Sequence, residues 1–313
     1  MKIFDTTLRD GCQSANVNFS VRDKIEIVKA LDDFGVDYIE LGWPASNEKE
    51  MEVFLEASKL NLKNSKIVAF GSTRRLNIGA EEDFNLKAIL ESKVNVACIF
   101  GKTWLKHVEM QLKTTGEDNL KVIRDSIEFL KKNNLEIIYD LEHFFDGFKD
   151  NKEYALDCIK EAILAGADYI VMCDTNGGSL IEEVEEILKQ VNEFLKNKNL
   201  NVKLGVHFHN DSGLAVANSL ISTNYNVEMI QGTINGFGER SGNADLCQII
   251  PNLVLKKKII LEKIELNELA KVSDFLYTLG NIKPNKSQPF VGKNAFSHKG
   301  GVHVDAIMKG ASY

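Results

Sequence analysis

The segment Lys203-Leu204-Gly205-Val206-His207-Phe208-His209-Asn210 joins a short apolar strand pattern to two histidines that are one residue apart. In an extended strand, residues i and i+2 point to the same side, so His207 and His209 would present both imidazoles on one face where the strand gives way to a loop. Imidazole pairs of this spacing bind divalent transition metals well. The alternative interpretation is two polar side chains that hydrogen-bond locally at a strand end. The surrounding sequence has to decide between the two.

Similar short apolar runs alternate with longer amphipathic stretches along most of the chain. The runs expected to form strands are Lys2–Thr7, Tyr38–Trp43, Lys66–Phe70, Val94–Phe100, Glu136–Leu141, Tyr169–Cys173, Val202–Phe208 and Met229–Thr233. The stretches expected to form helices are Val21–Phe34, Glu48–Leu60, Glu82–Glu91, Glu117–Asn133, Glu153–Ala165, Leu180–Leu195, Gly213–Thr223 and Asn243–Leu255. About eight βα units in a row predict a parallel sheet, and this number favours an α/β fold of the (β/α)8 TIM-barrel type. A doubly wound open sheet is the structural alternative, but no G-x-G-x-x-G motif follows the first strand.

Local capping signals place the ends of several helices. Ser20 stands directly before one helical pattern with Asp23 three positions on, and Asn47 stands directly before the next. Such residues accept hydrogen bonds from the free N–H groups of a first helical turn. Gly35 and Gly166 follow helical patterns at the position where helices commonly end in a left-handed residue.

The pattern changes after about residue 256. A helical stretch over Leu266–Leu279 leads into a linker with proline and asparagine over Asn281–Pro289, and a short glycine-rich piece then ends at Tyr313. We therefore predict a barrel domain over residues 1–258. Residues 259–313 are expected to form a linker and a small helical subdomain.

Composition limits the class of protein. At 313 residues and 44% hydrophobic content, the chain can bury a large core. Its formal net charge of −7 argues against nucleic-acid binding, which normally needs a basic surface. The five cysteines are odd in number and scattered, which is typical of a reducing compartment and opposes a disulfide framework or a structural zinc site. With no apolar run of about 18 residues and no signal-peptide pattern, we expect a cytoplasmic protein without membrane contact.

Polar residues concentrate where the predicted strands end. In a barrel of this type, the active site lies at the carboxyl ends of the strands. The polar clusters at these ends are Asp5–Gln13, Glu40–Pro44, Gly71–Arg75, Gly101–Lys102, Asp140–His143, Asp174–Gly178, the histidine pair and Asn235–Asn243. Any one of them alone is best interpreted as a capped turn. Together, aspartate, glutamate and histidine at one mouth predict a divalent metal site with nitrogen and oxygen ligands.

Three motifs, taken together, resemble one known family. They are Phe4-Asp5-Thr6-Thr7-Leu8-Arg9-Asp10-Gly11, His207-Phe208-His209-Asn210-Asp211 and Asn235-Gly236-Phe237-Gly238-Glu239-Arg240-Ser241-Gly242-Asn243. They resemble the metal-dependent acyl-CoA Claisen-condensation barrels, which are the 2-isopropylmalate, homocitrate and citramalate synthases, with hydroxymethylglutaryl-CoA lyase as a relative. Further matches at Tyr139–Gly147 and His298–His303 are most similar to the citramalate branch. The resemblance covers essentially the whole chain.

The resemblance implies one divalent metal ion, with the ligands Asp10, His207, His209 and Asn243. A site with oxygen ligands and open positions suits Mn²⁺ or Mg²⁺, and two histidines also permit Zn²⁺. The resemblance also implies catalytic and substrate-binding roles for neighbouring side chains. Arg9 would stabilise the alkoxide that develops on the substrate carbonyl. The substrate-binding residues would be Arg9, Gln13, Thr175 and Asp140. Glu142 would lie close to the reacting centre, and the alternative role for both Thr175 and Glu142 is to order Arg9 and the metal-bound waters.

The resemblance places the catalytic base after the barrel. His303 would remove a proton from the acetyl-CoA methyl group, assisted by Asp305 and Tyr313. In dimers of the family this segment reaches over the barrel mouth of the partner subunit. We therefore expect a homodimer in which His303 acts in trans. Because relatives usually continue past this motif, we also expect the chain to be a truncated form without a regulatory domain.

The expected reaction is the condensation of acetyl-CoA with a 2-oxo acid. With pyruvate the products are (R)-citramalate and CoA, as in isoleucine biosynthesis. The nearest alternative is the same chemistry on 2-oxoisovalerate, giving 2-isopropylmalate for leucine. A carbon–carbon lyase shares the metal ligands but relies on a cysteine in the loop after the eighth strand, and residues 235–243 contain none. A non-enzymatic scaffold would be favoured by loss of the metal ligands, but all four are present.

Overall fold

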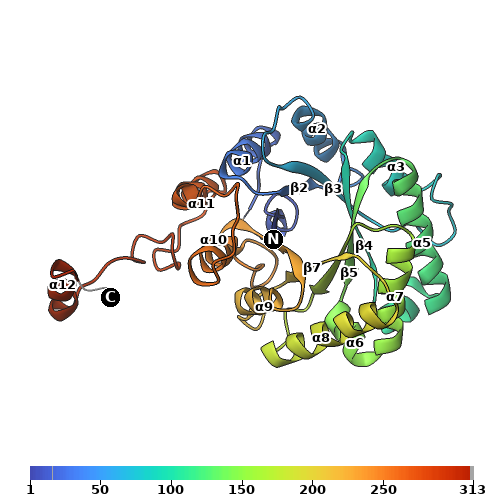
Figure 1. Cartoon of the computed structure of the whole chain (residues 1–313). Coiled ribbons are helices and arrows are strands. Elements are labelled where there is room, and N and C mark those ends of the chain that lie inside the picture. The colour runs from blue at the N-terminus through green and yellow to red at the C-terminus, as the bar shows by residue number, and fades with distance from the viewer. Residues whose placement is uncertain (16, 311–313) are drawn as a thin grey trace.

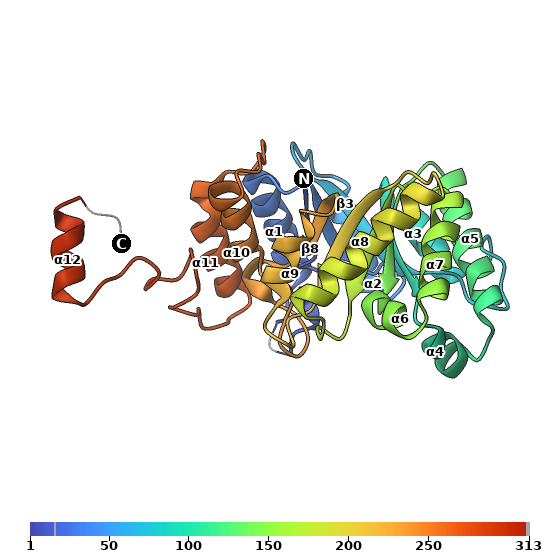
Figure 2. The ribbon, with the colours of Figure 1, turned by 60° about the horizontal axis from the view of Figure 1, so that its bottom comes forward.

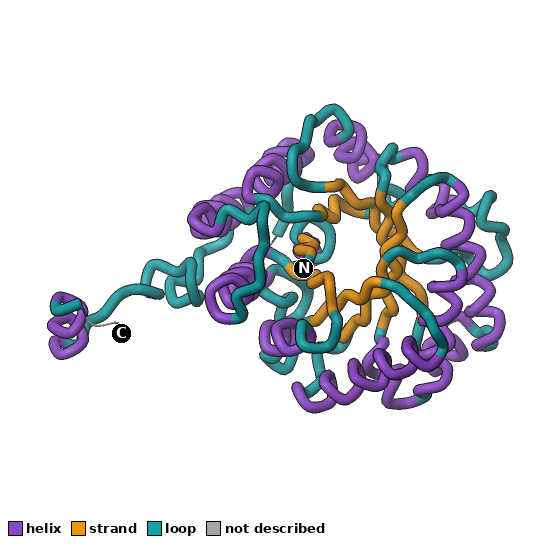
Figure 3. The backbone as a smooth tube through the Cα atoms, in the orientation of Figure 1, coloured by secondary structure: helices purple, strands orange, loops and turns teal. Residues whose placement is uncertain are grey.

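The computed structural model describes residues 1–15 and 17–310. Its centre is a closed barrel of eight parallel strands in chain order, within a ring of helices (Figures 1 and 3). The strands are β1 (Lys2–Asp5), β2 (Tyr38–Gly42), β3 (Lys66–Ser72), β4 (Val96–Lys102), β5 (Glu136–Glu142), β6 (Tyr169–Asp174), β7 (Lys203–Phe208) and β8 (Val227–Gly232). The barrel closes where β8 pairs with β1, with Met229 opposite Lys2 and Gly232 opposite Asp5. The predicted (β/α)8 fold is confirmed, and the open-sheet alternative is wrong.

The main helices follow the strands as the periodicity predicts. They are α1 (Val21–Phe34), α2 (Glu48–Ala57), α3 (Phe84–Glu91), α5 (Gly116–Lys132), α7 (Lys152–Leu164), α8 (Ile181–Asn197), α9 (Ala215–Ser222) and α10 (Leu246–Pro251). The predicted caps are present. Ser20 and Asp23 form a reciprocal capping box at the start of α1, and the Asn47 side chain accepts a hydrogen bond from the backbone N–H of Glu50. Gly35 ends α1 with a φ of 97°, a left-handed conformation that favours glycine.

Apolar side chains fill the barrel on both faces of the sheet. Outside, the strands pack against the helices in one continuous core, to which Leu31 of α1 and Ile39 of β2 belong. Inside, a second cluster that includes Phe4, Tyr38 and Met229 plugs the barrel. Because parallel strands in such barrels are buried on both faces, their sequences are apolar until they reach the mouth. The polar side chains at the carboxyl ends of the strands therefore lie directly above the apolar interior of the barrel.

The structure contains short elements that the periodicity does not predict. A helical turn, α4 (Leu105–His107), continues into a π-helical turn over Val108–Leu112 after β4. Helix α6 (Phe144–Asp150) begins two residues after β5 ends. The segments over 105–112 and 144–150 are shorter than the window over which helical periodicity becomes visible. A second π-helical turn, Asn252–Lys256, extends α10 within the stretch predicted to be helical as far as Leu255.

The helix predicted at Asn243–Leu255 begins later, at Leu246. Asn243 and Asp245 are held instead in isolated bridges to His209 and Thr233, which extend the strand-like backbone beyond β8. Asp245 then caps α10 by accepting a hydrogen bond from the backbone N–H of Cys247. The bridge keeps Asn243 at the mouth of the barrel, next to the histidine pair.

Beyond residue 258, the described residues form a 3-10 turn (Leu266–Glu268) and two α-helices, which an irregular linker joins. Helix α11 (Leu269–Leu279) packs against α1 at the side of the barrel, and α12 (Gly301–Met308) stands away from it at the end of the linker (Figures 1 and 2). Helix α12 exposes apolar side chains, among them Val302 and Met308, which are 78% and 83% exposed. Within residues 1–15 and 17–310, no helix has the length and apolar character needed to cross a bilayer.

Candidate metal centre

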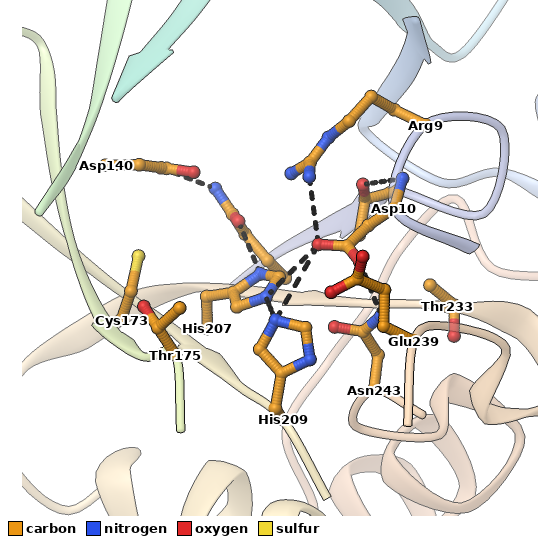
Figure 4. A network of polar contacts seen from close by, with 12 residues as sticks. Arg9, Asp10, Asp140, Cys173, Thr175, His207, His209, Thr233, Glu239 and Asn243 are labelled. Atoms are coloured by element: carbon orange, nitrogen blue, oxygen red, sulfur yellow. Dashed lines mark hydrogen bonds and ion pairs between the residues drawn. The ribbon is translucent and has the colours of Figure 1, made fainter. Parts of the chain in front are cut away.

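Asp10, His207 and His209 converge at the mouth of the barrel (Figure 4). Asp10 lies in the loop after β1. His207 is the last residue but one of β7, and His209 is the first residue after that strand. The His207 and His209 Nε2 atoms are 3.3 Å apart, and they lie 3.6 and 3.9 Å from Asp10 Oδ2. One ligand atom from each residue lies within 4.8 Å of the other two. The predicted convergence of these three side chains is therefore present.

Burial and charge keep these groups in the protonation states of metal ligands. Burial, followed by the neighbouring His209, lowers the pKa of His207 to about 4, and burial also lowers the pKa of His209. Burial alone would raise the pKa of Asp10, but the charges of Arg9 and of the two histidines outweigh it and lower that pKa. Near pH 7 the cluster therefore offers two neutral imidazoles and a carboxylate. This donor set fits a divalent cation.

Asn243 joins the cluster from the loop after β8. Its Nδ2 donates to Asp10 Oδ1 at 3.1 Å, while its Oδ1 is buried and accepts no hydrogen bond from any described residue. The role of Asn243 as a fourth metal ligand stays a prediction. The loop is tightly packed around it: a Cβ at Gly238 would lie 2.3 Å from the Asn243 amide, and one at Gly242, where φ is 88°, would lie 2.1 Å from the Gly236 carbonyl oxygen.

Arg9 is fixed by contacts on three sides. Its Nε donates to Glu40 Oε2 at 2.6 Å, and its Nη1 donates to Asp10 Oδ2 at 2.9 Å. The guanidinium carbon lies 3.8 Å from the centre of the Phe70 ring, a cation–π distance. Burial alone would lower the pKa of Arg9, but Glu40 and Asp10 outweigh it and raise that pKa. The guanidinium is therefore a permanent, rigidly held charge beside the candidate ligands.

Glu40 was not among the predicted site residues. It is fully buried in β2 and accepts a second hydrogen bond, from Thr6 Oγ1, at 2.5 Å. The signal in the sequence was a lone carboxylate within the apolar run Tyr38–Gly42. The structure thus assigns the ordering of Arg9 to Glu40, whereas Glu142, for which this role was the alternative, forms an ion pair with Lys102 at 2.6 Å.

An open cavity of about 710 Å³ lies over the cluster, and eight of the predicted site residues line it. They are Arg9, Asp10, Gln13, Asp140, Glu142, Thr175, His207 and His209. The lining residues that were not predicted are Trp43, Phe70, Phe100, Cys173, Glu239 and Arg240. The Thr175 hydroxyl accepts a hydrogen bond from the backbone N–H of His143 at 2.9 Å, so its own hydrogen remains available to a ligand.

An aromatic cluster and an ion pair lie at the sides of the cavity. Phe70 and Phe100 stack with ring centres 5.4 Å apart, and Trp43 meets both rings edge-on. On another side, Arg240 donates to both carboxylate oxygens of Asp211, which ties the loop after β8 to the loop after β7. No periodic pattern reveals these contacts, because they join residues from different βα units.

The residues predicted to supply the base are not brought to this cavity within one chain. His303 and Asp305 lie on α12, which stands away from the barrel (Figure 2). The Asp305 carboxylate pairs with Lys309 at 2.6 Å. Tyr313 lies outside the described residues.

Comparisons with known proteins find relatives that align along almost the whole chain. A family model described as HMGL-like matches residues 1–276. The chain is 49% identical over 311 residues to a protein of Sulfolobus acidocaldarius named (R)-citramalate synthase, and 33% identical over 311 residues to a Staphylococcus epidermidis protein named 2-isopropylmalate synthase. In each case 99% of this chain aligns, but it spans only 58% and 59% of those relatives. A solved structure of a Bacillus subtilis HMG-CoA lyase superimposes with a TM-score of 0.75 over 91% of this chain and 95% of that one, at 20% identity.

Proposed function

The chain belongs to the HMGL-like family, and from this premise we propose that it condenses acetyl-CoA with pyruvate to give (R)-citramalate and CoA. The observation that carries the proposal is the cluster of Asp10, His207 and His209 with the rigid Arg9 beside it. The choice of pyruvate is supported by relatives of 41–49% identity that are named (R)-citramalate synthase. The 2-isopropylmalate synthases are more distant, at 33%.

A divalent metal ion, Mn²⁺ or Mg²⁺ in preference to Zn²⁺, would be held by Asp10, His207, His209 and Asn243. When bound, it would supply Lewis-acid polarisation of the 2-oxo acid carbonyl. Two neutral imidazoles, one carboxylate and the unpartnered amide oxygen of Asn243 support this assignment. Two of these four ligands, Asp10 and Asn243, bind through oxygen, which favours Mn²⁺ or Mg²⁺ over Zn²⁺.

Arg9 would stabilise the negative charge that develops on the carbonyl oxygen. Its Nε and Nη1 are already committed to Glu40 and Asp10, so the guanidinium is oriented before substrate arrives and keeps further donors for the substrate. Preorganised donors of this kind lower the barrier because they need not reorient as charge develops.

The substrate carboxylate would be held by Thr175, with Gln13 and Asp140 completing the pocket and Glu142 near the reacting carbon. Thr175 is supported by its hydroxyl hydrogen, which is left free because its oxygen accepts from the backbone N–H of His143. Gln13, Asp140 and Glu142 are supported by their place in the cavity lining.

The base would come from a partner subunit. His303, assisted by Asp305 and Tyr313, would take a proton from the acetyl-CoA methyl group. The resulting carbanion would attack the pyruvate carbonyl carbon, and water would then cleave the thioester, releasing CoA. The projection of α12 from its own barrel supports an arrangement in which each arm of a cytoplasmic homodimer covers the other mouth (Figure 1).

The test is release of free CoA thiol from acetyl-CoA in the presence of Mn²⁺, with pyruvate, 2-oxobutyrate, 2-oxoisovalerate and 2-oxoglutarate in parallel. We expect the highest kcat/KM with pyruvate, loss of activity with EDTA and loss on Arg9→Ala. A preference for 2-oxoisovalerate would transfer the chain to the isopropylmalate alternative. Release of no thiol with any acid, from a folded and metal-loaded protein, would overturn the synthase proposal.

A further inference from the structure

A buried amide side chain, Gln231 of β8, lies between His207 and Asp140. Gln231 Oε1 is 2.9 Å from His207 Nδ1, and Gln231 Nε2 donates to Asp140 Oδ1 at 3.0 Å. The three residues come from β8, β7 and β5, and none exposes more than 5% of its surface. Figure 4 labels Asp140 and His207, and a dashed line joins each of them to the amide side chain between them.

These three residues can bond in only one direction when Asp140 is ionised. A carboxylate only accepts hydrogen bonds, so Gln231 must turn its NH₂ group toward Asp140. Its carbonyl oxygen, which also only accepts, then faces His207. The ring of His207 must therefore carry its hydrogen on Nδ1, which leaves a lone pair on Nε2.

The freed lone pair points at the candidate metal centre. His207 Nε2 lies 3.3 Å from His209 Nε2 and 3.6 Å from Asp10 Oδ2. The opposite tautomer would instead place a hydrogen there. His209 has no such control, because its buried Nδ1 bonds to none of the described residues.

We infer that Asp140 and Gln231 are positioning residues that hold His207 in its Nδ1–H tautomer, so that its Nε2 lone pair is presented to a metal ion. The inference rests on the proposed metal site, but the tautomer itself is a property of the metal-free chain. In that state His209 Nε2 is the donor in the 3.3 Å contact. Partners that orient a metal-bound histidine typically change metal affinity by about 10–100-fold.

The experiment compares wild-type protein with Gln231→Met and Gln231→Glu. Methionine has a similar length but removes the strong acceptor, whereas glutamate keeps an acceptor facing His207. Gln248→Met is the matched control, since Gln248 also donates to a carboxylate, Asp245, at 2.9 Å but contacts neither histidine. Thermal melts establish that each variant is folded.

Two readouts are taken at pH 8, above the pKa of about 7 to which burial raises Asp140. The first is the ¹⁵N spectrum of histidine-labelled, metal-free protein, in which the two tautomers have distinct ring-nitrogen shifts. The chain has six histidines, and His207→Asn identifies the signal of interest. The second is Mn²⁺ affinity, measured as free Mn²⁺ by electron paramagnetic resonance.

We expect His207 as the Nδ1–H form in wild-type, Gln231→Glu and Gln248→Met. In Gln231→Met this signal should shift toward the other tautomer, and Mn²⁺ should bind about 10–100-fold more weakly. An unchanged tautomer and unchanged affinity in a folded Gln231→Met variant would overturn the inference. Wild-type protein with the Nδ1–H signal but no Mn²⁺ binding would instead refute the proposed metal function.

Discussion

Replacing Glu40 with leucine tests whether the site depends on the rigid placement of Arg9. Leucine matches the shape of glutamate roughly but accepts no hydrogen bond, so both Arg9 Nε and Thr6 Oγ1 lose their acceptor. Breaking a buried ion pair from one side typically costs about 3–5 kcal/mol. Asp10 remains 2.9 Å from the guanidinium, so the lower end, about 3 kcal/mol of unfolding free energy, is expected.

The kinetic effect follows from the same contacts. Loss of one preorganised donor to a developing oxyanion lowers kcat by about 10²–10³-fold, and a displaced Arg9 approaches that loss. We expect kcat to fall by about 10²-fold with a smaller change in KM for pyruvate, because Asp10 and the Phe70 ring still hold part of the guanidinium. Denaturant unfolding and CoA thiol release measure the two quantities.

Two further variants make the comparison specific. Glu40→Gln should be milder, because both hydrogen bonds use Oε2 and an amide oxygen there can still accept them. Glu26→Leu removes an exposed ion pair with Lys29 and should change stability by less than about 1 kcal/mol. A Glu40→Leu protein as stable and as active as Glu26→Leu would refute the reasoning, since Arg9 would then need no buried acceptor.

Four other outcomes follow from the structure. Asp10→Asn should abolish high-affinity Mn²⁺ binding in calorimetry, and undiminished binding would exclude Asp10 as a ligand. Gly238→Ala should weaken Mn²⁺ binding, because its Cβ would come within 2.3 Å of the Asn243 amide; equal affinity would show that the loop adapts. Burial raises the pKa of Asp5 to about 7, so Asp5 takes up its proton at a higher pH in the folded chain than in the unfolded one. Its contribution to the unfolding free energy should therefore fall by up to about 4 kcal/mol as pH rises from about 4 to 7. The Asp5→Asn variant should lack this pH dependence. Mixing inactive Asp10→Asn and His303→Ala subunits should restore activity if each site uses residues of both chains, and a mixture that stays inactive would contradict action in trans.

The barrel could be predicted because its signal is local. Each βα unit shows its own apolar run, amphipathic stretch and cap, as Ser20 and Gly35 do for α1. The missed elements lack such a signal. Helix α6 starts two residues after β5 ends, and the residue between them, His143, has a φ of 55° and makes an abrupt turn that a periodic pattern cannot predict.

The place of the candidate metal site could be predicted because the fold rule puts all strand ends at one mouth, whereas the individual ligands came from the family resemblance. The same rule did not separate binding residues from caps. Asp174 accepts hydrogen bonds from the backbone N–H groups of Gly178 and Ser179, so it shapes a turn, whereas Asp10 joins the histidines. Contacts between different βα units, such as Arg9 with Glu40 and Gln231 with Asp140, depend on closure of the barrel.

The most direct test of the proposed reaction follows the carbon–carbon bond itself. Acetyl-CoA labelled with ¹³C in its methyl group is incubated with pyruvate, Mn²⁺ and the protein, and the product is examined by NMR and by chiral chromatography. The account predicts that the label appears in the methylene group of (R)-citramalate, with one CoA thiol released for each product formed. Label that stays in acetyl-CoA or acetate, while the folded protein binds Mn²⁺, would contradict the account.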